Sequence, residues 1–296
     1  QARSREMKRI SQQFRSQASL PAETIDGHRL EVHANVELPT EVESAVEWGA
    51  AGIGLFRSEF IHLQSPESGE DFHYQHYVAV LKSLNGLPLT VRTLDLGGDK
   101  LPEGSVDEEN PFLGCRSIRW CLANPEPFRA QIRAILRAGV HGPVRLMLPM
   151  ITTIPELDRS LQIIDEVSDE LRTEGVEFDE NIPVGVMVEV PSLALVANHV
   201  AHRVSFLSVG SNDLVQYTLA VDRGNEQVAD LYDPLHPAVL QLISSLIRVG
   251  EEHDIRVCLC GEMASEVIHV PRLGGLGLRE FSITPQVVPE VPQGIR

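Results

Sequence analysis

The hydrophobic residues of this chain gather in short runs rich in β-branched side chains, and these runs alternate with longer amphipathic stretches. This alternation is typical of βα units, in which parallel strands are joined by helices. The runs predict eight strands, at residues 31–36, 53–56, 89–94, 144–149, 184–190, 204–209, 255–260 and 280–283.

Several stretches between these runs carry the signals of helices. One opens with Thr40 and an acidic first turn, as helix N-termini often do. Another begins at Pro155 and ends at Gly175, two residue types favoured at these positions. Apolar residues at helical spacing predict helices at residues 40–50, 125–139, 155–175 and 237–253.

Eight strands with seven helical connections predict an α/β fold of the (β/α)8 TIM-barrel type. A doubly wound sheet is the alternative, but eight units in 296 residues favour the barrel. The thirteen residues after Ile283 include three prolines, so we expect the barrel to lack its regular last helix. We expect residues 1–25 to be a polar, partly helical lead-in from a missing upstream domain and residues 26–296 to form the barrel domain.

The composition excludes several classes of protein. With 42 acidic and 25 basic residues the formal net charge is −17, which argues against a general nucleic-acid binder. We expect no membrane insertion, because no apolar run approaches the roughly 18 residues of a membrane span. The polar start of the chain does not resemble a signal peptide. The four cysteines fit reduced thiols better than a disulfide scaffold, which predicts a cytoplasmic location.

Three arginines follow predicted strands at the end where barrels of this type carry their catalytic groups. Arg57 and Arg92 belong to the second and third strands, and Arg223 follows the sixth. Arginine binds phosphate or carboxylate oxygens in pairs and stays charged. A single arginine at such a position is more often a surface or ion-pair residue, but three near neighbouring strand ends favour a site for a compact anion.

Two carboxylates at the same end of the predicted barrel suit a magnesium ion, which prefers oxygen ligands. Glu189 lies in an apolar strand, where a charge is unfavourable unless it is paired or bound to a metal. A buried salt bridge is therefore its other interpretation. Asp213 follows a strand and precedes an apolar run, so a helix N-cap is the alternative for that residue.

Weaker signals accompany these residues. The glycines before Asp99 and Lys100 could form a phosphate cradle, but they lack the established spacings and equally suit a tight turn. Residues 222–225 alone read as an ordinary turn. The eleven histidines show no metal-binding spacing, and His236 before a proline predicts the start of a helix.

Seven segments together resemble one family, and they occur in the order and near the spacing of that family. It is the phosphoenolpyruvate–protein phosphotransferases, Enzyme I of the bacterial sugar phosphotransferase system. The resemblance is to the C-terminal phosphoenolpyruvate-binding domain, a (β/α)8 barrel, and extends from about Ala22 to Ile283. The segments are GIGLFRSEF (52–60), VRTLDLGGDK (91–100), ENPFLGCRSIR (core 110–119), GVMVEVP (185–191), SVGSNDLVQYTLAVDRGN (208–225), DPLHP (233–237) and CGEMA (260–264).

The resemblance implies roles for the residues in these segments. Arg57, Arg92 and Arg223 would grip the phosphoryl group of phosphoenolpyruvate, and Asn212 would contact its oxygens. Lys100 and Arg116 would be supporting positive charges. Glu189 and Asp213 would hold Mg²⁺, and Cys260 would donate a proton to the enolate.

The resemblance also implies the activity of a longer protein. That enzyme moves the phosphoryl group of phosphoenolpyruvate to a histidine in an N-terminal domain and on to a phosphocarrier protein, releasing pyruvate with the help of Mg²⁺. We expect the histidine-bearing domain to lie outside this chain, so the chain alone is expected to be incomplete for turnover. The resemblance further implies a homodimer formed through the barrel.

Some positions depart from the family pattern. Cys115 stands where tryptophan is common, and Ser265 and Glu266 replace a usual Gly-Asp pair beside the site. Three alternatives remain open: the barrel of a pyruvate phosphate dikinase or phosphoenolpyruvate synthase, a nitrogen-branch paralogue or multidomain fusion, and a non-catalytic phosphoenolpyruvate-sensing dimerisation module.

Overall fold

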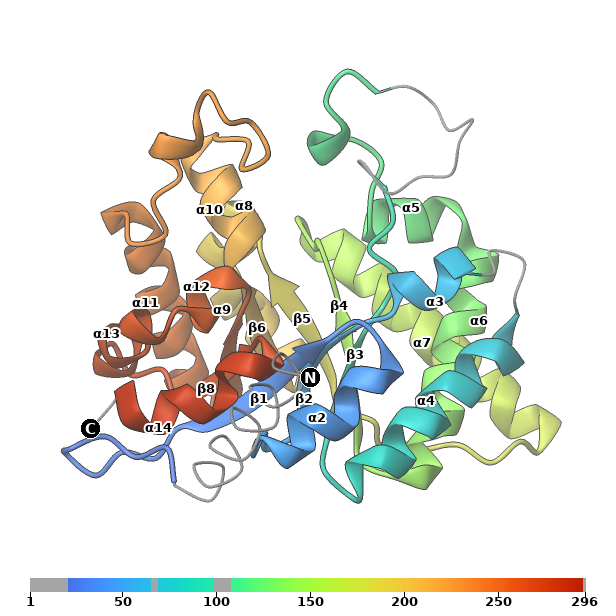
Figure 1. Cartoon of the computed structure of the whole chain (residues 1–296). Coiled ribbons are helices and arrows are strands. Elements are labelled where there is room, and N and C mark those ends of the chain that lie inside the picture. Colours follow the sequence, from blue (N-terminus) through green and yellow to red (C-terminus); the bar gives the residue numbers. More distant parts are fainter. Residues whose placement is uncertain (1–20, 65–68, 98–107, 295–296) are drawn as a thin grey trace, which may run out of the picture.

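A computed structural model of the chain describes residues 21–64, 69–97 and 108–294. Eight parallel strands close into a barrel in which each strand pairs with the next and β8 returns to pair with β1 (Figure 1). This confirms the predicted (β/α)8 fold and excludes the doubly wound sheet. The strands are β1 (Glu31–Val36), β2 (Ile53–Arg57), β3 (Leu89–Arg92), β4 (Val144–Leu148), β5 (Val184–Val188), β6 (Phe206–Gly210), β7 (Arg256–Cys260) and β8 (Glu280–Ile283).

Several predicted strands were too long at their carboxyl ends. The prediction of residues 89–94 was wrong at its last positions, because the Leu94 amide donates to the Gln131 side chain and not to a neighbouring strand. The strand predicted to reach residue 190 ends at Val188, since Val190 is already the N-cap of a helix. Apolar side chains thus continue past the last ladder bond, where the chain turns out of the barrel.

Helices surround the barrel and cover its outer face (Figure 1). The α-helices are α2 (Val42–Glu47), α3 (Glu59–Gln64), α4 (Glu70–Leu84), α5 (Ile118–Ala123), α6 (Pro125–Ala138), α7 (Ile154–Glu174), α8 (Pro191–Leu195), α9 (Ala197–Val200), α10 (Ser211–Leu219), α11 (Pro237–His253), α12 (Glu262–Ser265), α13 (Val270–Gly275) and α14 (Val291–Gly294). Short 3₁₀ helices are η1 (Pro39–Glu41), η3 (Pro111–Leu113), η4 (Gly139–His141), η5 (Ala201–Arg203), η6 (Ala229–Leu231), η7 (Val267–His269) and η8 (Pro285–Glu290).

The local sequence explains where the long helices begin and end. α7 starts with a capping box, in which the Thr153 side chain accepts from the Glu156 amide, and ends at Gly175 with φ of 69°. The His236 side chain accepts from the Ala238 amide and so begins α11, as predicted. The helix predicted at residues 40–50 is shorter, because η1 occupies its start and α2 begins only after Glu41.

In the described residues that follow β8, no regular long helix forms, as the prolines of this segment predicted. After β8 the backbone forms η8, which contains Pro289, and then the one-turn helix α14. Proline has no amide hydrogen to donate to a continuing helix. The predicted lead-in at residues 1–25 falls mostly on residues 1–20, outside the described part, and Lys100 also lies outside it.

The barrel interior carries charged groups at the end where the strands begin. Arg256 pairs with Glu31 at 2.9 Å, Arg145 lies 3.3 Å from Glu280, and His33 Nε2 lies 3.2 Å from the same carboxylate. Burial alone would lower the pKa of His33, but the carboxylates of Glu280 and Glu31 raise it above the ordinary value. Ion pairs between acidic and basic side chains therefore occupy this end of the barrel.

An apolar layer separates that end from the opposite one. It consists of five buried side chains, Leu55, Met147, Met187, Phe206 and Cys260. The larger hydrophobic core lies between the strands and the surrounding helices. Among the helices of the described ranges, none combines the length and hydrophobicity needed to cross a membrane.

Candidate functional site

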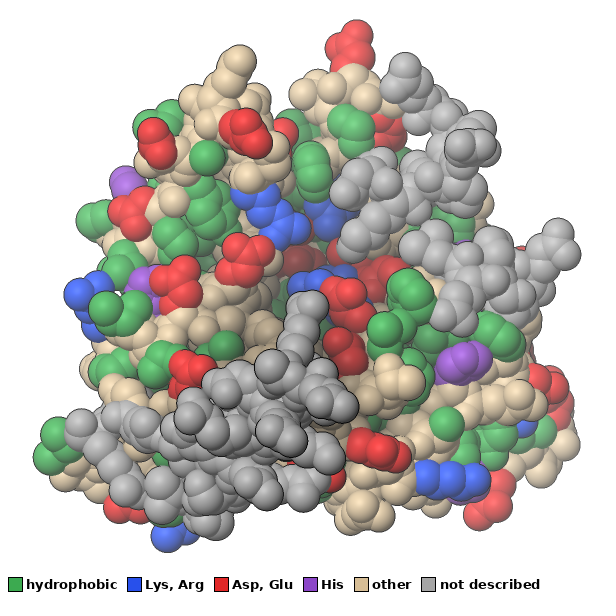
Figure 2. All heavy atoms as spheres, in the orientation of Figure 1, with side chains coloured by type: hydrophobic (Ala, Val, Ile, Leu, Met, Phe, Trp, Pro, Cys, Tyr) green, Lys and Arg blue, Asp and Glu red, His purple; other side chains and the backbone are tan. Residues whose placement is uncertain are grey.

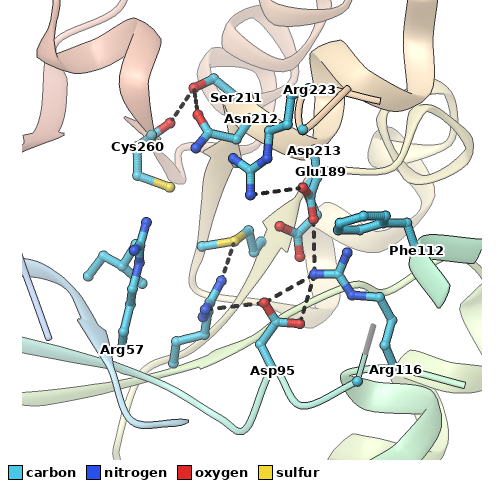
Figure 3. A pocket seen from close by; sticks show the side chains of 17 residues that line it. Arg57, Asp95, Phe112, Arg116, Glu189, Ser211, Asn212, Asp213, Arg223 and Cys260 are labelled. Atoms are coloured by element: carbon cyan, nitrogen blue, oxygen red, sulfur yellow. Dashed lines mark hydrogen bonds and ion pairs between the residues drawn. The ribbon is translucent and has the colours of Figure 1, made fainter. Parts of the chain in front are cut away.

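A cavity of about 230 Å³ opens at the carboxyl ends of the strands (Figure 3). Figure 2 shows basic side chains in the hollow between two raised loops, with acidic side chains close beside them. All the predicted site residues that the structure describes line this cavity: Arg57, Arg92, Arg116, Glu189, Asn212, Asp213, Arg223 and Cys260. Residues from strands far apart in the chain therefore meet in one site.

Arg92 lies at the floor of the cavity and is buried with two carboxylates. Its Nη2 atom pairs with Glu59 and lies 3.2 Å from Asp95. Burial alone would lower the pKa of Arg92, but Glu59, Asp95 and Glu189 raise it well above the ordinary value. The guanidinium therefore keeps a fixed position and a permanent positive charge.

Arg116 bridges two sides of the cavity. Its Nη2 atom lies 3.1 Å from Asp95 Oδ1 and 3.1 Å from Asp213 Oδ2. The Phe112 ring lies beneath the guanidinium, with its centroid 5.7 Å from Cζ. Arg116 thus links the residues that follow β3 to the start of α10.

Arg57 and Arg223 are the more accessible cations of the site. Arg57, at the end of β2, has a side chain 37% exposed and pairs with Glu37. Arg223 has a side chain 38% exposed and lies 4.0 Å from Asp213 and 3.9 Å from Glu262. Among the described residues these two contacts are the ion pairs of Arg223, and both are long, so its guanidinium can bind an anion without breaking a short ion pair.

Glu189 and Asp213 are buried acidic residues of the same cavity. The Met150 amide donates to Glu189 Oε1 at 2.7 Å. Burial, together with the carboxylates of Asp213 and Asp95, raises the pKa of Glu189 to about 8. Two buried carboxylates whose negative charges repel each other fit a divalent cation such as Mg²⁺.

The alternative interpretations of these two acids fit less well. α10 begins at Ser211, so Asp213 lies inside its first turn and is not the N-cap. Among residues 21–64, 69–97 and 108–294, no basic nitrogen lies within 4.0 Å of Glu189, as a buried salt bridge would require.

Cys260 ends β7 at the opposite side of the cavity from Phe112 and Arg116 (Figure 3). Its thiol lies 3.3 Å from the Val209 carbonyl oxygen and 3.6 Å from Ser208 Oγ. Burial raises the pKa of Cys260 to about 11, so the thiol is protonated at neutral pH. The nearby Glu262 has a side chain that is 75% exposed and lies 3.9 Å from Arg223.

With this geometry established, comparison with known proteins identifies the family. Residues 11–296 match the family described as PEP-utilising enzyme, PEP-binding domain. The chain belongs to this family. PEP is phosphoenolpyruvate, so the match agrees with the resemblance seen in the sequence.

Curated relatives of this PEP-binding domain are named phosphoenolpyruvate-protein phosphotransferase. The protein from Cupriavidus necator is 43% identical over 281 residues, which cover 93% of this chain and 48% of that protein. Those from Priestia megaterium and Staphylococcus carnosus are 44% and 45% identical, covering 92% and 88% of this chain and 48% and 46% of their own length. The chain therefore spans about half the length of the curated relatives it matches.

Solved structures share the fold at low identity. A citrate lyase from Burkholderia xenovorans has a TM-score of 0.57 at 18% identity, covering 94% of this chain and 80% of its own. A malate synthase from Haloferax volcanii, solved as a lead(II) complex, has a TM-score of 0.58 at 12% identity, covering 90% and 72%. These similarities extend to the barrel fold alone.

Two glycines of the PEP-binding domain shape the cavity: Gly97, which the sequence suggested as part of a phosphate cradle or a tight turn, and Gly261, to which it assigned no role. Gly97 has φ of 122°, and a Cβ atom there would lie 2.3 Å from Arg116 Cβ. Gly261 has φ of 101°, and its Cβ would lie 2.3 Å from Ser211 Oγ. Only glycine fits these positions without strain. For Gly261 the sequence signal was a glycine directly after the end of β7.

A buried polar network behind the cavity holds the ends of β2 and β3 together. The Gln131 amide nitrogen donates to Ser58 Oγ at 2.7 Å and to the Tyr77 hydroxyl at 3.1 Å. Ser58 in turn donates to the Arg92 carbonyl oxygen at 2.6 Å. Sequence analysis missed this network because its members lie on separate elements far apart in the chain.

Proposed function

We propose that this chain binds phosphoenolpyruvate together with Mg²⁺, and that the longer protein to which it corresponds transfers the phosphoryl group to a histidine in another domain. The observation that carries the proposal is one cavity in which arginines surround two buried carboxylates and a protonated thiol. The names of the curated relatives favour this reaction over that of a pyruvate phosphate dikinase or a phosphoenolpyruvate synthase.

The phosphoryl group would be bound by Arg57, Arg92 and Arg223, with Asn212 as a further hydrogen-bond donor. Charge-assisted hydrogen bonds from guanidinium groups are among the strongest that proteins make. They would also stabilise the charge that shifts toward the leaving group. Lys100, outside the described residues, and Arg116 would add positive charge.

Glu189 and Asp213 would hold the metal ion. When bound, Mg²⁺ acts as a Lewis acid that stabilises the negative charge of the leaving enolate. A bound cation would explain why Glu189 is buried beside Asp213, because without it burial and the neighbouring carboxylate disfavour the ionised form of Glu189.

Cys260 would complete the reaction as the proton donor. Its S–H bond breaks as a C–H bond forms at the methylene carbon of the enolate, whose electron pair supplies the new bond, and the oxygen becomes the ketone of pyruvate. The thiolate then regains a proton from water. A thiol with a pKa of about 11 is in its protonated form before the reaction.

The partners of the whole protein are part of the same proposal. They are the histidine-bearing domain, a phosphocarrier protein and a second copy of the barrel, all in the cytoplasm. The resemblance of the sequence to Enzyme I supports these partners.

Calorimetric titration of the chain with phosphoenolpyruvate tests the central claim. We expect binding with Mg²⁺ present and none after addition of EDTA, and we expect no phosphorylation of a carrier protein by the chain alone. Equal binding in EDTA would contradict the metal assignment. Failure to bind under both conditions would contradict the function itself.

A further inference from the structure

Two loops rise at the mouth of the cavity and carry two of its arginines (Figure 1). The first follows β3, and its described part, residues 108–117, contains η3 and Arg116. The second follows α10, spans residues 220–236, and contains Arg223 and η6. Both loops are joined to α10 by a tyrosine hydroxyl. Resting on the function proposed above, we propose that the hydroxyls of Tyr217 and Tyr232 are positioning groups: they hold the two loops that carry Arg116 and Arg223 in the place where these arginines can reach the substrate.

Tyr217 fastens the first loop. It lies four residues after Asp213 in α10, so both side chains are on one face of the helix. Its hydroxyl donates to the Phe112 carbonyl oxygen at 2.5 Å and accepts from Arg116 Nη1 at 3.3 Å. The Tyr217 hydroxyl oxygen thus contacts both the backbone of the first loop and the guanidinium of Arg116.

Tyr232 fastens the second loop. It follows η6, and its hydroxyl donates to the carbonyl oxygen of Asn212 at 3.1 Å. The backbone amide of Arg223 donates to Gln216 Oε1 at 3.2 Å, which gives the same loop a second attachment to α10. The second loop is therefore attached to α10 at two places, the backbone of Arg223 and the hydroxyl of Tyr232.

Both hydroxyls remain donors across the physiological pH range. Burial raises the pKa of Tyr217 and that of Tyr232 to about 12. A loop that is held in place before the ligand arrives loses less conformational freedom on binding, which strengthens the complex. If the two bonds only stabilised the fold, the loss of either hydroxyl would have the same effect on binding in an Arg116 variant as in an Arg223 variant.

The variants Tyr217→Phe and Tyr232→Phe each remove one oxygen atom and keep the ring. We expect each to weaken Mg²⁺-dependent phosphoenolpyruvate binding by about threefold to tenfold, as for the loss of one hydrogen bond. Tyr74→Phe is the matched control, because the Tyr74 hydroxyl contacts His141 Nε2 at 2.7 Å and Tyr74 does not line the cavity. Its affinity should equal that of the unmodified chain.

Crossed double variants separate positioning from general stabilisation. In the Arg116→Lys background, Tyr217→Phe should have little further effect, whereas Tyr232→Phe should keep its full effect. The pattern should reverse in the Arg223→Lys background. Equal losses from both tyrosine variants in both backgrounds, or no loss from either tyrosine, would overturn the proposal.

Hydrogen exchange of the ligand-free chain gives a test that does not depend on the ligand. We expect faster exchange at residues 110–117 in Tyr217→Phe and at residues 222–232 in Tyr232→Phe, each confined to its own loop. If the unmodified chain fails to bind phosphoenolpyruvate, the proposed function falls while exchange still reports on the loops. If the chain binds but exchange and affinity are unchanged in both variants, the positioning role alone is wrong.

Discussion

Cys258 and Cys260 have identical side chains but different surroundings, because they lie at different positions along one strand. Both belong to β7 and are buried, but only Cys260 lines the cavity. Cys258 lies deeper and pairs in register with Glu280 in the charged end of the barrel. Burial raises the pKa of both thiols, so access to the ligand and not the protonation state distinguishes them.

We predict that Cys260→Ala keeps phosphoenolpyruvate binding but loses solvent exchange of the pyruvate methyl protons when the histidine-bearing domain is supplied. The reason is that alanine has no proton to give to the methylene carbon. Proton NMR of pyruvate in D₂O measures the exchange. Cys258→Ala is the control and should retain both properties; normal exchange in Cys260→Ala would place the acid on another residue.

We predict that Arg92→Ala and Arg223→Ala each weaken phosphoenolpyruvate binding by roughly 10- to 150-fold, the range for one charge-assisted hydrogen bond. Calorimetric titration measures the loss. Arg223→Ala is the cleaner variant, because Arg92→Ala also leaves the buried carboxylates of Glu59 and Asp95 without their partner. Thermal unfolding must therefore accompany the Arg92 measurement.

The control for both arginines lies on α6. Arg129 pairs with Glu166 at 2.8 Å and Glu170 at 2.5 Å on α7, outside the cavity. Arg129→Ala should bind phosphoenolpyruvate normally. Similar losses in all three variants would show that the anion site has been misplaced.

Between α3 and α4, two buried histidines pack their rings together. His62 and His73 have ring centroids 6.2 Å apart at an interplanar angle of 18°. α3 begins with Glu59, the partner of Arg92, so this packing supports an element that reaches the cavity. Burial, with the nearby charges of His62 and His76, lowers the pKa of His73 to about 4.

We predict that the free energy of unfolding falls as the pH drops from about 6.5 toward 4. Over this window the unfolded chain binds a proton at His73 and the folded chain does not, so acid favours unfolding, by up to about 3 kcal/mol. Urea unfolding at several pH values measures the slope. His73→Gln should flatten it in part, since burial also lowers the pKa of His62; an unchanged slope would contradict the assignment.

The whole molecule carries a formal net charge of −17, and the resemblance to Enzyme I implies that it forms a homodimer. Like charges on two copies repel each other, and salt screens this repulsion. We predict a dimer in sedimentation experiments at tens of micromolar protein, with tighter association at higher ionic strength. A monomer at both low and high salt would contradict the prediction.

Much of the architecture could be predicted because it depends on local patterns. Short apolar runs and amphipathic stretches have different periods, so the eight strands and the helices α6, α7 and α11 were identifiable one segment at a time. The long helix α4 was not among those predicted. The order of the strands then placed Arg57, Arg92 and Cys260 at one end of the barrel. The family resemblance added Asn212 and Arg116 through their motifs.

The limits of the strands and the support of the site depended on contacts between distant segments. Only the folded chain brings the Tyr217 hydroxyl to the Phe112 carbonyl, 105 residues away in the sequence, or Gln131 to Ser58, 73 residues away. Likewise, a capping residue and a metal ligand look the same in sequence at Asp213. The sequence by itself determined which elements form and which side chains they carry, because those depend on neighbours along the chain. The tertiary structure alone decided which of these side chains meet, because closing the barrel sets those distances.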